Sequence, residues 1–244
     1  MKSDPKLIIE LCLIRHGMTE YNQARRYLGR TDLPVSEQGM EELRTKKQEH
    51  PDMYPRVGKL FASPMLRCRQ TADILYPEQT PVLIGEWKEM DFGIFEGRSA
   101  DEMEDDAEYR KWVDSNCEGP IPEGESRTEF NTRNMVGLER CLAMICGDSK
   151  NDPEPREDEG PILLSVSSIK SDIHDTDGVL YDRTKNRLPA ENTYNLNNQS
   201  ARMITAAAVV HAGTIMSIVS TLTGEEYYDC YVKNGEGYRL MFEV

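Results

Sequence analysis

Long hydrophobic runs and positive charge are both scarce in this chain. No apolar segment approaches the about 20 residues that a helix needs to cross a bilayer, so the sequence predicts no membrane-spanning helix. Lysine and arginine together number 29, against 43 aspartates and glutamates, and the formal net charge is −14. This excess of negative charge argues against nucleic acid and anionic membrane surfaces as partners. An anionic substrate would therefore have to be bound by a local basic pocket.

Histidines and paired cysteines are also scarce. The six cysteines show no Cys-x-x-Cys spacing, and most of them fall in expected strands and helices, where buried, reduced thiols are the usual state. His174 stands among three aspartates in residues 171–177, but loop carboxylates without regular spacing are usually solvated. We therefore expect neither a metal nor another cofactor.

The first apolar run of the chain is short, is interrupted by Glu10 and continues directly into the sequence around His16. A signal peptide would instead carry an uninterrupted apolar core followed by a cleavage site. The sequence therefore indicates a cytoplasmic protein.

Strand and helix signals alternate along most of the chain. Apolar runs predict strands, and capping residues such as Ser36 and the pair Ser126 and Glu129 predict helix starts. The expected strands are 7–14, 57–62, 82–85, 162–169, 206–210 and 238–244, and the expected helices include 36–50, one capped by Ser63, 126–146 and 214–222. This alternation predicts an α/β fold: a three-layer α/β/α arrangement with a mostly parallel central sheet.

The alternation breaks between about residues 148 and 203. Residues 151–160 are acidic and contain two prolines, which predicts a mobile surface loop. A structureless segment as long as the whole of this region is rare in a compact domain. We therefore expect one domain over residues 1–244, with a partly structured insertion at about 148–203. The insertion could fold over the pocket as a specificity lid or form a homodimer contact, and the sequence leaves both roles open.

Two of the four histidines stand at the carboxyl ends of expected strands. Arg15-His16-Gly17 follows the first strand, and His211-Ala212-Gly213 follows the strand 206–210. Ligands of open α/β sheets bind at the carboxyl ends of the strands. We therefore expect the two imidazoles to meet in one site, where a nitrogen nucleophile surrounded by positive charge would suit a phosphoryl group.

Residues on both sides of His16 in the sequence supply further donors to this site. Asn22 offers a neutral amide, and Arg15 and Arg26 offer forked guanidinium groups that suit phosphate oxygens. Arg67 adds another guanidinium from the helix expected after the second strand. Arg26 is equally able to pair with a carboxylate instead of the substrate.

Together these motifs resemble the histidine phosphatase superfamily, the phosphoglycerate-mutase-like group. The motifs fall in the family's order over about residues 7–147 and 204–244, which is most of the chain. The matching positions are the Arg-His-Gly signature at 15–17, Asn22, Arg26, Arg67, Glu89 and His211. The segment 29–39, Gly-Arg-Thr-Asp-x-Pro-x-Ser-x-x-Gly, is most similar to the branch that includes α-ribazole phosphatases.

The resemblance implies a phosphatase that hydrolyses a small phosphate monoester without a metal. His16 would attack phosphorus and carry a transient phosphohistidine, with Glu89 as general acid and then base and His211 as the second catalytic histidine. The groups expected to bind phosphate are Arg15, Asn22, Arg26, Arg67 and the backbone amide of Ala212. The nearby carboxylates Glu86, Asp91 and Glu96 compete with Glu89 for the role of the acid.

Two other functions stay open. One is phosphoryl transfer of the phosphoglycerate mutase type. Mutases of this family typically carry tryptophan after the glycine aligned with Gly29 and a paired-arginine segment, whereas this chain has Arg30 and no Arg-Arg after Glu89. The other is a regulatory protein that binds phosphate without turnover, which the filled catalytic positions speak against.

Overall fold

A seven-stranded sheet forms the centre of the molecule in the computed structural model, which describes residues 7–147, 162–169, 179–180 and 202–244. The strand order is β3-β2-β6-β1-β7-β4-β5. In chain order the strands are β1 (Leu7–Arg15), β2 (Lys59–Ala62), β3 (Val82–Leu83), β4 (Ile162–Ile169), β5 (Val179–Leu180), β6 (Arg202–Val210) and β7 (Gly237–Glu243).

The directions of the strands confirm the expected α/β class. β1, β6, β2 and β3 pair in parallel, and β7 runs antiparallel to β1. β4 is antiparallel to β7, so it shares the direction of β1, and β5 turns back along β4. The sheet is therefore mixed but mostly parallel.

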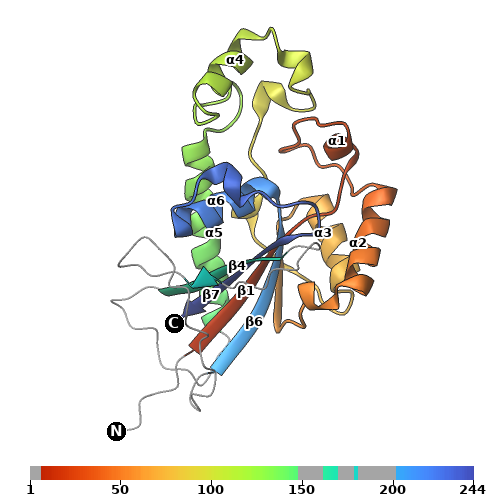
Figure 1. Ribbon diagram of the computed structural model, residues 1–244, viewed down its shortest axis with the longest axis vertical. Helices are drawn as coiled ribbons and strands as arrows, with labels where there is room; N and C mark the ends of the chain where they lie inside the picture. The colour runs from red at the N-terminus through yellow and green to blue at the C-terminus, as the bar shows by residue number, and fades with distance from the viewer. Residues whose placement is uncertain (1–6, 148–161, 170–178, 181–201) are drawn as a thin grey trace.

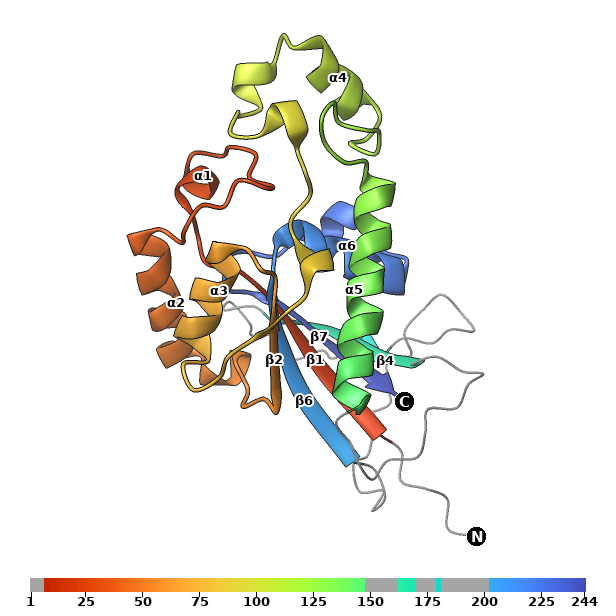
Figure 2. The same ribbon diagram turned by 180° about the vertical axis from the view of Figure 1, so that it is seen from behind.

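Helices cover both faces of this sheet, as Figures 1 and 2 show. The α-helices are α1 (Glu20–Gln23), α2 (Glu37–Glu49), α3 (Leu66–Leu75), α4 (Ala107–Asp114), α5 (Arg127–Gly147) and α6 (Ala212–Thr223). Successive side chains of a strand point to opposite faces. Leu11 and Leu13 of β1 accordingly pack with residues of α5 and α6, whereas Cys12 and Ile14 pack with residues of α2 and α3. The result is the expected three-layer α/β/α arrangement.

A third, aromatic cluster lies beyond the carboxyl ends of β1 and β6, around α4 at the top of Figure 1. Phe95, Tyr109 and Trp112 are buried there, and their ring centroids lie 5.4 to 6.0 Å apart. This small core is separate from the two cores that flank the sheet.

Helix starts follow the predicted caps in two cases and depart from them in a third. Ser36 accepts a hydrogen bond from Gly39 N, and Ser126 and Glu129 form a reciprocal capping box. Ser63, expected to cap α3, does not do so. The helix begins at Leu66, whose amide donates to the Asp32 carboxylate at 2.6 Å. A distant side chain therefore caps α3, because the helix begins at Leu66, with Met65 rather than Ser63 in the N-cap position.

Part of the expected insertion belongs to the sheet. β4 lies where a strand was expected and pairs with β7 from Ile162 opposite Glu243 to Ile169 opposite Gly237. The expected loop at 151–160 and His174 lie outside the described residues. The assignment of residues 1–244 to one domain and the lid or dimer role of the insertion stay predictions. Among the helices that the structure describes, none combines the length and apolar character needed to cross a membrane.

Candidate active site

Pairing between β1 and β6 brings the two histidines together. Arg15 lies opposite Val210 in the parallel register, and the His16 amide donates to the Val210 carbonyl at 2.9 Å. The next residue of each strand therefore projects from the same edge of the sheet. The rings of His16 and His211 are both buried, with centroids 5.2 Å apart and planes at 67°.

One hydrogen bond sets the tautomer of His16. Its Nδ1 lies 2.8 Å from the carbonyl oxygen of Gly17. A carbonyl only accepts, so Nδ1 carries the proton and Nε2 keeps its lone pair. Burial, followed by the positive charges of Arg67 and Arg15, lowers the pKa of His16 well below its usual value. The ring is therefore neutral near pH 7, with Nε2 available as a nucleophile.

Both ring nitrogens of His211 are engaged by the protein. Arg67 Nε donates to His211 Nδ1 at 3.2 Å, and His211 Nε2 lies 2.8 Å from Ser63 Oγ. Since Nδ1 accepts, the proton of the neutral ring is on Nε2 and is donated to the Ser63 hydroxyl. Burial, then the positive charge of Arg67, lowers the pKa of His211 well below its usual value. A direct contact of this ring with phosphate would require one of the two hydrogen bonds to be exchanged.

Arg67 is completely buried and rigidly placed. Besides the bond to His211, its Nη1 donates to the Thr31 carbonyl at 3.0 Å and its Nη2 to the Gly29 carbonyl at 2.8 Å. A guanidinium has five N–H groups, and these contacts use three of them. The remaining donors, with the full positive charge, can bind an oxyanion beside His16.

Arg15 carries a buried donor without a partner. Its Nη1 donates to the Tyr231 hydroxyl and to the Val232 carbonyl, both at 2.7 Å. Its Nε is buried and has no hydrogen-bond partner among the described residues. An unsatisfied buried donor costs about 1–3 kcal/mol, and an anionic ligand at this position would remove that cost.

Glu89 lies against the amino end of α6, beside His211. Its Oε1 accepts from the Met90 amide at 2.9 Å, and its Oε2 accepts from the Gly213 amide at 3.3 Å. Burial raises the pKa of Glu89, although these amides and the charge of Arg67 oppose the shift. A buried carboxyl with a raised pKa can hold a proton to higher pH than an exposed one, as a general acid requires.

Asn22 joins the site through a neighbouring amide. Its Oδ1 accepts from the Thr19 amide at 3.2 Å in a capping box that opens α1, and from Asn234 Nδ2 at 3.5 Å. Asn234 Nδ2 also donates to the His16 carbonyl at 2.8 Å. The Asn22 side chain thus lies next to the backbone of His16, with part of its capacity used to cap a helix.

Arg26 is engaged by a carboxylate. Its Nη1 and Nη2 donate to the two oxygens of Glu102 at 2.8 and 2.6 Å, and Nη1 also contacts the Gly97 carbonyl. None of its described contacts is with the histidine cluster. The structure therefore favours the carboxylate partner over the substrate contact expected for Arg26.

Ala212 is the first residue of α6, directly after His211. Amides in the first turn of a helix lack partners inside the helix and favour anions. The Gly213 amide is taken by Glu89, which leaves the Ala212 amide as the expected phosphate donor at this helix end.

The segment 231–236 was not predicted as part of the site. Tyr231 and Val232 contact Arg15, and Asn234 contacts His16 and Asn22. The Asn-Gly pair at 234–235 is a turn signal, and Gly235 has φ 79°. Nothing in the local pattern indicates, however, that this turn lies over the first strand. Ser63 is likewise a site residue whose sequence context suggested only a cap.

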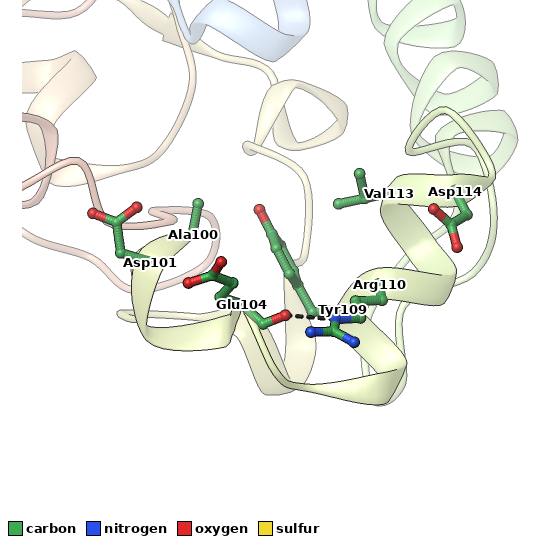
Figure 3. Close-up of a pocket in the computed structure, with 7 residues that line it drawn as sticks. All are labelled: Ala100, Asp101, Glu104, Tyr109, Arg110, Val113 and Asp114. Carbon is green, nitrogen blue, oxygen red and sulfur yellow. Dashed lines mark hydrogen bonds between the residues drawn. The ribbon is translucent and has the colours of Figure 1, made fainter.

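A cavity of about 390 Å³ lies elsewhere, beside α4. Figure 3 shows its lining residues and the hydrogen bond from Arg110 to the Glu104 carbonyl. The lining includes three carboxylates, those of Asp101, Glu104 and Asp114, and none of the expected site residues. Its negative charge makes it unsuitable for phosphate.

No group of three or more metal-binding side chains gathers within residues 7–147, 162–169, 179–180 and 202–244. The positive charge of the site comes from Arg15 and Arg67. These two guanidinium groups are buried beside the imidazoles, and guanidinium is a cation suited to phosphate recognition.

Comparison with known proteins places the chain in a family. The model of the histidine phosphatase superfamily (branch 1) matches residues 11–148. The chain belongs to this superfamily. Proteins named "Probable phosphoglycerate mutase GpmB" from Yersinia pestis and Yersinia pseudotuberculosis are 32% identical to it over 144 residues, 57% of this chain. The match spans 66% of these curated relatives, just under two thirds of their length.

Several solved structures share the fold. The α-ribazole phosphatase from Shigella flexneri has a TM-score of 0.62 at 18% identity and covers 94% of this chain and 89% of its own. A phosphoglycerate mutase from Thermus thermophilus has a TM-score of 0.55 at 23% identity, with 93% and 89% covered. Such identities establish the fold alone. The α-ribazole phosphatase is one of several such neighbours, so the expected placement in its branch is not distinguished from the others.

Proposed function

We propose that this protein is a phosphomonoesterase that forms a phosphohistidine on His16. The observation that carries the proposal is the hydrogen bond from His16 Nδ1 to the Gly17 carbonyl, which leaves the Nε2 lone pair free. The neutral state of that ring and the two buried guanidinium groups beside it support the same chemistry.

In the first step, Nε2 of His16 forms a bond to phosphorus while the bond from phosphorus to the ester oxygen breaks. Glu89 donates its proton to the departing oxygen, and its raised pKa suits this role. Phosphoryl transfer leaves charge on the equatorial oxygens. We assign Arg15, Arg67 and the Ala212 amide to the stabilisation of that charge.

In the second step, water displaces the histidine. The Glu89 carboxylate takes a proton from the attacking water, the P–N bond breaks, and inorganic phosphate leaves with the ring again neutral. Glu89 is then protonated for the next cycle. We assign His211 to holding Arg67 in place through its Nδ1, in addition to contributing to the polar surroundings of the phosphate.

The direct test is release of inorganic phosphate by the purified protein, with His16→Ala as the blank. We expect turnover of p-nitrophenyl phosphate and of some members of a panel of metabolite phosphates, and a loss of at least about 10³-fold in the variant because the nucleophile is gone. Absence of any His16-dependent phosphate release across the panel would contradict the proposal and would favour a non-catalytic phosphate-binding role.

Phosphoryl transfer of the mutase type is the second candidate, favoured by the similarity to probable phosphoglycerate mutases. Arg30 and the missing paired arginines favour hydrolysis. Assays of 3-phosphoglycerate with and without a bisphosphoglycerate primer separate the two: a mutase produces the isomer, and a phosphatase releases phosphate. The cytoplasmic location and the homodimer stay predictions.

A further inference from the structure

The guanidinium of Arg133, on α5, is fully hydrogen-bonded. Its Nη1 donates to the carbonyls of Glu86 and Lys88, both at 2.6 Å, and its Nη2 donates to the carbonyl of Glu89 at 3.0 Å. Its Nε and Nη2 donate to the two oxygens of Glu125 at 2.5 and 2.7 Å. All three nitrogens are thus used, and three of the acceptors belong to the segment that carries Glu89.

This arrangement fixes the backbone that ends in the proposed acid. Residues 86–89 leave a short 3-10 turn, Gly85–Trp87, without a strand or α-helix to satisfy their carbonyls. Buried carbonyls need hydrogen-bond partners. The carbonyls of Glu86, Lys88 and Glu89 all accept from the planar guanidinium group of Arg133. Immediately after this point the Glu89 carboxyl reaches the Gly213 amide.

The Glu125 carboxylate orients the Arg133 guanidinium group and also binds the backbone just after Glu89. Its Oε2 accepts from the Asp91 amide at 2.9 Å. Burial acts to raise the pKa of Glu125, but the hydrogen bonds from Arg133 and Asp91 and the charge of Arg133 outweigh it, so the pKa is lowered and the carboxylate stays ionised. The guanidinium carbon of Arg133 also lies 4.7 Å from the centroid of the Phe130 ring. Residues before and after Glu89 are thereby tied to α5.

We propose that Arg133, oriented by Glu125, is a positioning residue that holds the Glu89 carboxyl in place for proton transfer to the leaving group. This inference rests on the proposed phosphohistidine chemistry and extends it to a residue of α5. Arg133 touches neither substrate nor the reacting atoms in this assignment; it acts through the backbone of Glu89. The charge of Arg133 also opposes the rise in the pKa of Glu89, which gives the experiment a second readout.

The experiment compares two substrates that differ in their need for a general acid. The nitrophenolate released from p-nitrophenyl phosphate leaves without much help, whereas the alkoxide of glycerol 2-phosphate has to be protonated. For Arg133→Gln, we expect kcat/KM on glycerol 2-phosphate to fall about tenfold further than kcat/KM on p-nitrophenyl phosphate. Loss of the charge should also raise the pKa of Glu89, so the basic limb of the pH profile should move to higher pH.

Arg140→Gln is the matched control. Arg140 lies on the same helix and contacts the Glu86 side chain at 3.1 Å, but it is half exposed and bonds no backbone of the segment. We expect both activities of this variant to stay within about twofold of wild type, because exposed ion pairs contribute little. Arg133→Lys keeps the positive charge, so the basic limb of its pH profile should stay in place. It lacks the planar guanidinium group that binds several acceptors at once, so it should show part of the substrate-dependent loss.

A double variant separates positioning from general damage. If Arg133 acts through Glu89, adding Arg133→Gln to Glu89→Gln should lower turnover of glycerol 2-phosphate by less than about twofold further. Equal losses on both substrates with an unmoved basic limb, in variants that keep the wild-type circular dichroism spectrum, would overturn the positioning role alone. A wild-type protein without His16-dependent turnover would overturn the proposed function, and the positioning role with it.

Discussion

At the scale of single residues, burial shifts the protonation equilibria of two groups toward the states that the proposed chemistry needs. His16 is kept neutral by burial and by two neighbouring guanidinium groups, and Glu89 is pushed toward its acid form by burial. A nucleophile without its proton and an acid with its proton are the states that phosphoryl transfer to histidine requires. The same burial that produces them also makes the ionised form of Glu89 unfavourable.

Glu89→Gln should therefore stabilise the protein against unfolding above pH 4.5. The folded pKa of Glu89 is raised above the ordinary carboxyl value of 4.5, so the folded state binds the proton more tightly than the unfolded state. By linkage, the stability due to the protonated carboxyl is fully present below pH 4.5 and is lost as the pH rises through the folded pKa. The neutral amide does not undergo this loss.

Thermal melts of wild type and Glu89→Gln from pH 4 to pH 8 test this. The difference in Tm in favour of the variant should grow as the pH rises. A Tm difference between variant and wild type that stays constant over this range would contradict the account. It would show that the Glu89 carboxyl ionises as easily in the folded protein as in the unfolded chain.

Arg26 illustrates what residue type alone leaves open. An arginine near a histidine signature is equally suited to phosphate and to a carboxylate, and the chain contains many carboxylates. Glu102, which takes the guanidinium, is 76 positions away in the sequence. Only the folded arrangement decides between the two partners.

At the scale of elements, the site depends on how β1, β6 and α6 meet. β6 lies between β1 and β2, and its central residues Ala206, Ala207 and Ala208 are fully buried. The parallel register sets both histidines at one edge, and α6 begins directly after His211. The turn from β6 into α6 therefore places the His211 imidazole and the Ala212 amide next to each other in the chain.

Gly213 is required where α6 meets Glu89. A Cβ at this position would lie 2.3 Å from Glu89 Oε1 and 3.1 Å from the Phe130 ring. Gly213→Ala should therefore displace the carboxyl and lower kcat on an alkyl phosphate by at least about tenfold, which is part of the about 10²–10⁴-fold that a general acid contributes. Overpacking should also lower the unfolding free energy by about 1–3 kcal/mol.

Gly147→Ala, at the end of α5, is the control for this substitution. A Cβ there meets no atom of the described residues within 4 Å, and alanine favours helix over glycine by up to about 1 kcal/mol. We expect unchanged activity and equal or higher stability. Wild-type activity of Gly213→Ala in steady-state assays would show that Glu89 does not need its observed position.

At the scale of the whole molecule, the net charge of −14 opposes the substrate that the site is built to bind. The positive charge of the site comes from the buried Arg15 and Arg67 at the carboxyl edge of the sheet, whereas the long-range field repels an anion. Salt screens distant exposed charges more than close buried ones. Raising NaCl from about 10 to 150 mM, where the Debye length falls to about 8 Å, should therefore lower KM for a phosphate dianion. A KM that rises steadily over this range would indicate that local attraction by exposed cations dominates.

The fold class, the strand that carries each histidine and the pairing of the two rings follow from local patterns in the sequence. Apolar runs and caps are local signals, and the carboxyl edge of a parallel sheet is a general place for ligands. The cap of α3 by Asp32, the turn at 231–236 over His16 and the fork of Arg133 depend on contacts between distant segments. No periodicity or spacing encodes those contacts.

The identity of the phosphorylated atom is the central claim, and trapping the enzyme during turnover tests it most directly. Rapid quenching under alkaline conditions, followed by peptide mass spectrometry and phosphorus NMR, locates the phosphoryl group. We predict phosphate on Nε2 of His16, absent from His16→Ala. Phosphate on His211, or on Nδ1 of His16, or continued turnover by His16→Ala, would contradict the account.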